Sequence, residues 1–105
     1  MIFETLYESS KRGELMLIEG GMCHWHLRRD GQITIREIIS TTPGSGSAML
    51  RALVSIGLEN GATSIFAKCP ANLAANLWYK KRGFILIGEE TTKSGRDLKL
   101  WRLPL

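Results

Sequence analysis

The sequence predicts an α/β fold, a mixed and mostly antiparallel sheet with helices on its faces, and three observations lead to this prediction. Apolar, β-branched segments joined by tight turns occupy residues 15–40, which is typical of an antiparallel meander. A glycine-containing loop at residues 41–47 is followed by apolar residues at helical spacing. A strand–helix–strand step then spans residues 33–69, and its right-handed crossover indicates that these two strands are parallel.

The first half of the chain is predicted to contain one helix and three strands. Phe3, Leu6 and Tyr7 recur at helical spacing before Gly13, which predicts a short helix over residues 3–12. The predicted strands are residues 15–19, 22–28 and 33–40, with Gly20–Gly21 and Asp30–Gly31 as the turns between them.

The second half alternates helices with strands. Apolar residues from Ala48 to Ile56 recur with a helical period, and Asn60–Gly61 ends that helix. Pro70 then interrupts an apolar strand, and Gly83 follows the end of a second amphipathic helix. The remaining predicted elements are a strand at residues 64–69, a helix at 73–82, and strands at 84–90 and 97–103 joined by a turn at 93–95.

Length and composition predict one soluble domain over residues 1–105. Hydrophobic residues make up 44% of the chain and charged residues 23%, which is ordinary for a globular protein. No apolar run reaches the roughly 20 residues of a membrane span, and the first residues do not resemble a signal peptide. Cys23 and Cys69 form neither a disulfide framework nor a zinc spacing, so we expect reduced thiols in a cytoplasmic protein.

The segment from Thr41 to Ser47 contains Gly44-x-Gly46 between a strand and a helix. Glycine lets backbone N–H groups approach a ligand closely, and a helix start offers unpaired N–H donors and a partial positive charge, which suits a phosphate. The hydroxyl groups of Ser45 and Ser47 would add donors. A flexible turn is the alternative, and the segment is neither a dinucleotide fingerprint, which needs a third glycine, nor a Walker loop, which needs Gly-Lys-Ser/Thr.

A second sequence pattern follows the glycine loop after one predicted helix and one predicted strand, and it bears on how that loop is interpreted. It consists of Asn72, Ala75, the pair Trp78–Tyr79 and the pair Gly83–Phe84. In this spacing the chain resembles the second signature of the GNAT acyltransferase superfamily. The first signature of that family, Gln/Arg-x-x-Gly-x-Gly/Ala at a helix start, is matched by the glycine loop with Thr41 in place of Gln or Arg. The resemblance covers roughly residues 15–105 and implies a GNAT-like fold with one splayed parallel strand pair.

The resemblance also implies a reaction and a site. Acetyl-coenzyme A would bind where the third strand splays from the strand that ends at Cys69, and a primary amine, on a small molecule or a protein, would attack its thioester directly in a ternary complex. Tyr79 would act as the general acid that protonates the leaving thiolate; the alternative is a buried core tyrosine. Asn72 would contact the cofactor, although it also suits a helix N-cap. The residues implied for cofactor binding are Ile38, Ile39, Ser40, Thr41, Gly44, Ser45, Gly46, Ser47, Asn72 and Tyr79.

The general base stays open. Glu37 lies on the third strand near the expected splay and is the first candidate for a catalytic carboxylate. His24 and His26 share one face of the second strand. Since histidine as a residue type can act as a base near neutral pH, either of them, or a relayed water, is an alternative. Two histidines without a third ligand predict no metal site. Cys69 could accept the acetyl group covalently, or it could be a small buried thiol.

The basic residues and the short N-terminal part bear on partners. The net charge of +4 favours anionic ligands, and Arg51 or the cluster Lys80–Arg82 could neutralise the 3′-phosphate of coenzyme A. The family spends more residues on the walls of the acceptor site, so we expect that side to be open or closed by a second copy of the chain. Two other functions stay as alternatives: a non-catalytic module with the same fold, and a small basic nucleic-acid-binding protein. The second rests on charge and aromatic residues alone.

Overall fold

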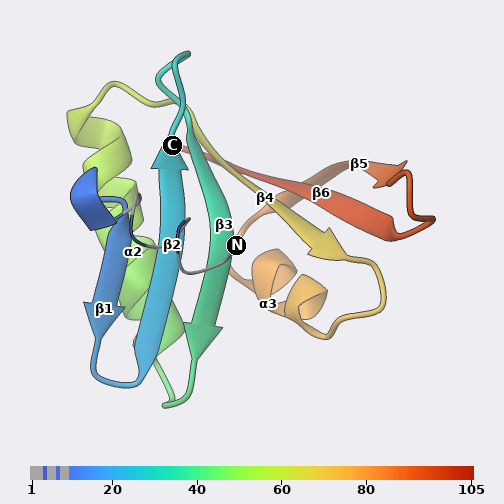
Figure 1. The fold of residues 1–105 in the computed structure, drawn as a ribbon, viewed down its shortest axis with the longest axis horizontal. Helices are drawn as coiled ribbons and strands as arrows, with labels where there is room; N and C mark the ends of the chain where they lie inside the picture. The colour runs from blue at the N-terminus through green and yellow to red at the C-terminus, as the bar shows by residue number, and fades with distance from the viewer. Residues whose placement is uncertain (1–3, 5–6, 8–9) are drawn as a thin grey trace.

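The structure, a computed structural model, describes residues 4, 7 and 10–105, so half of the helix predicted over residues 3–12, with Phe3 and Leu6, lies outside the described residues. The described elements are β1 (Leu15–Ile18), β2 (Gly21–Leu27), β3 (Ile33–Ser40), α2 (Ser45–Glu59), β4 (Ser64–Pro70), α3 (Ala75–Lys81), β5 (Ile85–Thr91) and β6 (Asp97–Pro104). The described strands form one six-stranded sheet in the order β1-β2-β3-β4-β6-β5 (Figure 1). Within this part of the chain, no helix has the length and apolar character needed to cross a membrane.

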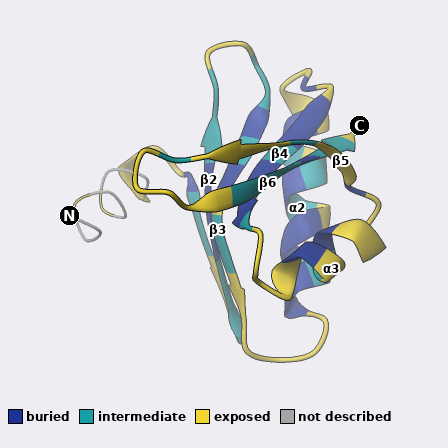
Figure 2. Ribbon diagram, turned by 90° about the vertical axis from the view of Figure 1, so that its right-hand side faces the viewer, coloured by how far each residue is buried: buried dark blue, intermediate teal, exposed yellow. Residues whose placement is uncertain are grey.

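The sheet has the mixed topology that the sequence predicts. Only β3 and β4 pair in parallel, and the other neighbouring strands pair antiparallel. The predicted strand bounds agree with the observed ones to within one residue. α2 and α3 lie on the same side of the sheet, and the β5–β6 hairpin extends away from the β1–β3 meander (Figures 1 and 2). The fold prediction, a mixed sheet with one parallel pair flanked by helices, is therefore confirmed.

The hydrophobic core lies between α2 and the sheet. Met49 and Leu53, one helical turn apart on α2, are fully buried against Ile33 of β3 and Ile65 of β4. Burial of each such side chain contributes about 1.5–3 kcal/mol relative to leaving it exposed. This packing holds the two parallel strands together at their N-terminal ends.

β3 and β4 separate after three residue pairs. The parallel ladder joins Ile33 to Ile65, Thr34 to Phe66 and Ile35 to Ala67, and it ends there. Beyond this point β3 continues to Ser40 beside β2, while β4 continues beside β6. The backbone edges that would face each other across residues 36–40 and 68–70 are therefore left without a strand partner.

A β-bulge at Arg36 coincides with this separation. On β2, His24 pairs with Glu37 and the next residue, Trp25, pairs with Ile35, so Arg36 is an extra residue on β3. Because side chains alternate between faces along a strand, one extra residue reverses the phase. As a result Ile38 faces the α2 side together with its partner Cys23, and Glu37 faces the opposite side.

Asn76 fixes α3 against the end of β4. Its side-chain amide donates to the carbonyl oxygens of Pro70 and Leu73, both at 2.9 Å, and its carbonyl oxygen accepts from Trp101 Nε1 at 2.9 Å. A seven-residue helix is too short to be stable by itself. These bonds from a buried side chain therefore position α3 by tertiary contact.

The N-terminus of α3 differs from the prediction. The helix begins at Ala75, Ala74 is its N-cap, and no side chain caps it. Asn72 lies before the helix and is exposed, so its interpretation as the N-cap was wrong. The segment up to Ala74 instead forms turns, in which the Leu73 amide bonds to the Pro70 carbonyl.

Glu14 joins the start of β1 to the end of β2. Its buried carboxylate accepts from Arg12 Nε at 2.7 Å and from the Leu27 amide at 2.8 Å, and His26 Nδ1 lies 3.1 Å from both of its oxygens. Burial acts to raise the pKa of this carboxyl group, but the hydrogen bonds from Arg12, Leu27 and His26 outweigh burial and lower it. The ionised form of Glu14 therefore stabilises the fold.

We expect Asn76→Ala to lower the free energy of unfolding by about 2–4 kcal/mol, because it removes three hydrogen bonds of about 1 kcal/mol each and leaves buried groups unpaired. Urea denaturation measures the change. The matched control is Asn72→Ala, an exposed asparagine four residues earlier, with an expected effect of about 0.5 kcal/mol or less. Equal destabilisation by the two substitutions would contradict the role of Asn76.

We expect Glu14→Gln to destabilise the protein at pH 7 and to do so less as the pH falls. A carboxyl group whose folded pKa lies below its unfolded value of about 4.3 contributes stability above that value, and the contribution disappears as the pH falls through the folded pKa. Urea denaturation at several pH values between 3 and 7 measures the difference. Glu19→Gln, in the exposed β1–β2 turn, is the control, and a constant difference between wild type and Glu14→Gln across this range would refute the argument.

Candidate functional site

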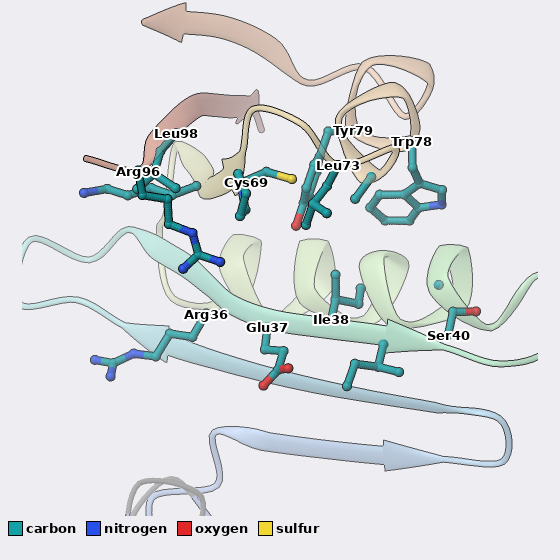
Figure 3. Close-up of a pocket in the computed structure, with 15 residues that line it drawn as sticks. Arg36, Glu37, Ile38, Ser40, Cys69, Leu73, Trp78, Tyr79, Arg96 and Leu98 are labelled. Atoms are coloured by element: carbon teal, nitrogen blue, oxygen red, sulfur yellow. The ribbon is translucent and has the colours of Figure 1, made fainter. Parts of the chain in front are cut away.

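A cleft of about 600 Å³ lies where β3 separates from β4. β3 forms one wall, and the other is formed by the end of β4, α3 and the start of β6 (Figure 3). Arg36, Glu37 and Arg96 lie at one end of the cleft and Ser40 and Trp78 at the other, with Cys69 and Tyr79 between them (Figure 3). We call these the splay end and the helix end.

The helix end is shaped by two glycines. Gly44 has a φ of 84° and caps α2, which begins at Ser45, so residues 45–47 form the first helical turn and not a loop. The amide groups of Gly46 and Ser47 have no acceptor four residues earlier within the helix, and this turn opens toward the cleft at Gly46. A Cβ atom on Gly46 would lie 3.2 Å from Cζ2 of Trp78, so glycine leaves the space in which the indole ring stands.

The β1–β2 turn holds this segment in place. The carbonyl oxygen of Gly20 accepts from the Thr41 amide at 2.7 Å, from Thr41 Oγ1 at 3.1 Å and from Ser45 Oγ at 3.0 Å. The Ser45 hydroxyl is buried and also contacts the Ser40 hydroxyl. The hydroxyl groups of Thr41 and Ser45 thus bond within the protein, and neither residue lines the cleft.

Tyr79 and Cys69 occupy the middle of the cleft. The Tyr79 ring is packed edge-on against Phe84 with a centroid distance of 5.0 Å, and its hydroxyl group points toward β3 (Figure 3). Burial raises the pKa of Tyr79 above its ordinary range, with smaller contributions from Cys69 and Cys23. Burial also raises the pKa of Cys69. Both groups therefore carry their protons at neutral pH.

The splay end is the charged end of the cleft. Arg36 and Glu37 come from the bulged part of β3, Lys68 from β4, and Arg96 from the turn before β6. The Arg96 guanidinium group reaches from that turn toward β3 (Figure 3). The Lys68 ammonium group lies 2.9 Å from Glu90 Oε1.

The two histidines share the sheet face opposite α2, as the alternation of β2 predicts, but their surroundings differ. His24 is buried, and burial followed by the charge of Arg36 lowers its pKa. His26 is held by Glu14 and lines a second cavity of about 360 Å³ together with Thr34, Ile35, Arg36 and Lys68. This second cavity shares Arg36 and Lys68 with the cleft.

The cleft brings together part of the predicted site. Of the implied residues, those that line it are Glu37, Ile38, Ile39, Ser40, Gly46 and Tyr79, and those that do not are Thr41, Gly44, Ser45, Ser47 and Asn72. Trp78 is half-buried, packs against the hydrophobic core and also lines the cleft. Whether the implied residues bind a cofactor or act in catalysis stays a prediction.

Sequence reasoning missed Asn76 and the cations Arg36, Lys68 and Arg96. Asn76 lies one helical turn from Tyr79 on the buried side of α3, and this spacing was the available signal. The cations come from three separate segments that only the folded sheet brings together. Among the described residues, no cluster of three or more His, Cys, Asp or Glu side chains is placed to hold a metal ion.

Comparison by sequence identifies no relative, since neither a protein-family model nor a curated protein matches the chain. Comparison by structure identifies solved proteins with a similar fold. Nourseothricin acetyltransferase is 20% identical with a TM-score of 0.71, over 81% of this chain and 57% of that protein. A protein assigned as a streptothricin acetyltransferase from Bacillus anthracis, solved with acetyl-coenzyme A, is 20% identical with a TM-score of 0.72, over 81% of this chain and 55% of that one.

The ribosomal-protein-S18-alanine N-acetyltransferase of Escherichia coli is also similar, at 19% identity and a TM-score of 0.71, over 96% of this chain and 76% of that protein. This chain thus spans less than two thirds of the length of the first two proteins and about three quarters of the third. The structural neighbours consistently include acetyltransferases of the GNAT class. The chain therefore has the fold of the GNAT acetyltransferases.

Proposed function

We propose that the chain binds acetyl-coenzyme A in the cleft and transfers its acetyl group to a primary amine by direct attack in a ternary complex. The observation that carries the proposal is the cleft itself, which runs from the N-terminus of α2 to the point where β3 and β4 separate. The likeness in fold to acetyltransferases, one of them solved with acetyl-coenzyme A, supports it.

In this proposal the cofactor lies along β3. The pyrophosphate group takes the free amides at the first turn of α2, where the helix dipole favours negative charge. The pantetheine arm pairs with the unpartnered edge of β3 at Ile38, Ile39 and Ser40, as an added strand would. The thioester then reaches Tyr79 and the splay end.

Tyr79 is the proposed general acid. The amine nitrogen attacks the thioester carbonyl carbon, the carbon–sulfur bond breaks, and the departing thiolate takes the phenolic proton of Tyr79. Burial raises the pKa of Tyr79, so the phenol carries the proton that this step requires at neutral pH. The raised pKa of Cys69 supports direct attack over an acetyl-cysteine intermediate, since the protonated thiol is a weak nucleophile.

Glu37 is the proposed base. It borders the cleft at the splay end, on the sheet face opposite α2, and would take the proton that the attacking amine loses. The cofactor and the amine then approach the thioester carbon from opposite faces of the sheet, through the gap between β3 and β4. His26 borders the adjoining cavity and is the alternative base.

Calorimetric titration with acetyl-coenzyme A tests the cofactor site, and we expect saturable binding. Ser47 does not line the cleft, but in this proposal its hydroxyl group reaches the pyrophosphate from the first turn of α2, so Ser47→Ala should weaken binding about three- to tenfold. Ser45→Ala should instead lower the free energy of unfolding by about 1 kcal/mol, since that hydroxyl group bonds to the Gly20 carbonyl oxygen. Absence of binding by the wild-type chain refutes the proposal, and weaker binding in Ser45→Ala at unchanged stability refutes the assignment of donors.

We expect Tyr79→Phe to lower the rate of acetyl transfer by about 10²- to 10⁴-fold, the usual contribution of a general acid, while it retains acetyl-coenzyme A affinity. Release of free thiol against a panel of primary amines measures the rate. Phenylalanine keeps the packing against Phe84, and a melting temperature within a few degrees of wild type would verify this. Tyr7→Phe, at an exposed tyrosine, is the control. A wild type that binds acetyl-coenzyme A but acetylates no amine would favour the non-catalytic alternative.

A further inference from the structure

Positive charge in the cleft is concentrated at the splay end. The lining residues with a permanent positive charge are Arg36, Lys68 and Arg96, and all of them lie around the point where β3 and β4 separate. The residues that line the helix end, among them Ser40, Gly46 and Trp78, are uncharged (Figure 3). The cations are therefore placed near the reacting thioester and not near the proposed pyrophosphate position.

A separate cation, Arg82, lies beside the helix end of the cleft. The Arg82 guanidinium group lies 5.7 Å from the centroid of the Trp78 ring, just outside the cleft. It belongs to the Lys80–Arg82 cluster at the end of α3. Charge on the phosphates of coenzyme A thus leaves the cations of the splay end unexplained.

Two of these cations have no counter-ion within the part of the chain that the structure describes. Among the described residues, the side chains of Arg36 and Arg96 form no ion pair, whereas Lys68 pairs with Glu90. The cleft and the second cavity together are lined by one carboxylate, Glu37. An anion placed between Arg36 and Arg96 would therefore meet little competition from the protein itself.

The second cavity gives a ligand access to Arg36 and Lys68 from the other face of the sheet. It is lined by His26 and Thr34, cross-strand partners on the face opposite α2, and it shares Arg36 and Lys68 with the cleft. At about 360 Å³ it falls within the size range of small-molecule sites. A molecule in this cavity would contact Arg36 and Lys68 directly, and Glu37 and Arg96 line the adjoining cleft.

We propose that the amine acceptor carries a carboxylate group a few atoms from its nucleophilic nitrogen, and that Arg96 and Arg36 bind this carboxylate while Glu37 faces the amine. This inference rests on the proposed acetyl transfer, because it names the class of its acceptor. A guanidinium group binds a carboxylate through two parallel hydrogen bonds and so fixes orientation as well as charge. The acceptor class is therefore that of amino acids and of other small amino-carboxylates.

A matched pair of acceptors tests the proposal. β-Alanine carries the carboxylate, and β-alaninamide has the same skeleton without the charge. We expect Arg96→Gln to lower kcat/KM for β-alanine about ten- to hundredfold, the range for loss of a charge-assisted hydrogen bond, and to change that for β-alaninamide less than twofold. Arg36→Gln should act in the same direction. Lys93→Gln, an exposed cation in the same turn as Arg96 that does not line the cleft, should change neither value.

Equal losses of kcat/KM for the two amines in Arg96→Gln would overturn the proposal. So would a loss that appears only when succinyl-coenzyme A replaces acetyl-coenzyme A, because the cations would then serve the acyl group.

A binding measurement separates this inference from the proposed function. In the presence of coenzyme A, we expect β-alanine to shift the side-chain Nε–Hε resonances of Arg36 and Arg96 in a saturable way and β-alaninamide not to shift them. If the wild type acetylates no amine but shows these shifts, acetyl transfer is wrong and the carboxylate site stands. If the wild type acetylates amines but shows no such shift, the carboxylate site is wrong.

Discussion

The separation of β3 from β4 is the constraint on which the rest of the structure depends. Two parallel strands that share a core would ordinarily continue their ladder, yet here it ends after three residue pairs. The bulge at Arg36 bends β3 at this point. The side-chain amide of Asn76 donates a hydrogen bond to the Pro70 carbonyl oxygen and so holds α3 against the end of β4. On one side of this separation, the core between α2 and the sheet holds β3 and β4 together, and α3 lies on the other side.

The separation of β3 from β4 leaves backbone groups without hydrogen-bond partners in the sheet, and these groups determine what the site can bind. Strand edges inside a sheet ordinarily satisfy each other, and burying unpaired backbone groups is costly. The open edge of β3 can only be tolerated because it faces a cleft, where solvent or a ligand supplies the missing partners. The same cleft holds Tyr79 in apolar surroundings, and burial keeps its proton in place. One departure from regular strand pairing thus leaves both an unpaired strand edge and a buried, protonated tyrosine in the same cleft.

The charged side chains of the cleft lie at its splay end, and the pairing of the strands does not by itself require this arrangement. Arg36 takes the bulge position, Lys68 lies beyond the last parallel pair, and Arg96 precedes the strand that pairs with β4. These three cations concentrate positive potential at the splay end. The aromatic and aliphatic groups that line the cleft have a low dielectric constant, which strengthens the attraction of this region for an anion. The helix end relies instead on backbone donors and the dipole of α2. Positively charged side chains and free backbone donors thus lie at opposite ends of one cleft.

Much of the fold could be predicted from the sequence, because its signals are local. Period-two alternation located the strands to within one residue, and turn glycines separated them. The right-handed crossover predicted the parallel pair, and the resemblance carried by residues 72–84 implied a GNAT-like fold. These features depend on neighbours a few residues apart, so one sequence suffices to show them. The placement of Ile38 and Tyr79 beside each other at a splay came from the resemblance, and the structure brings both to the cleft.

Only the tertiary structure decided which polar side chains serve the fold and which face the site. Asn72 and Asn76 are indistinguishable by residue type, but packing against Trp101 buries Asn76 and leaves Asn72 exposed. Thr41 and Ser45 suit a phosphate loop, yet the β1–β2 turn takes their hydroxyl groups through one carbonyl oxygen of Gly20. The face that Glu37 occupies depends on one extra residue in the pairing of two strands. Each outcome is set by contacts between segments distant in sequence, whereas the sequence by itself determined the elements and their order.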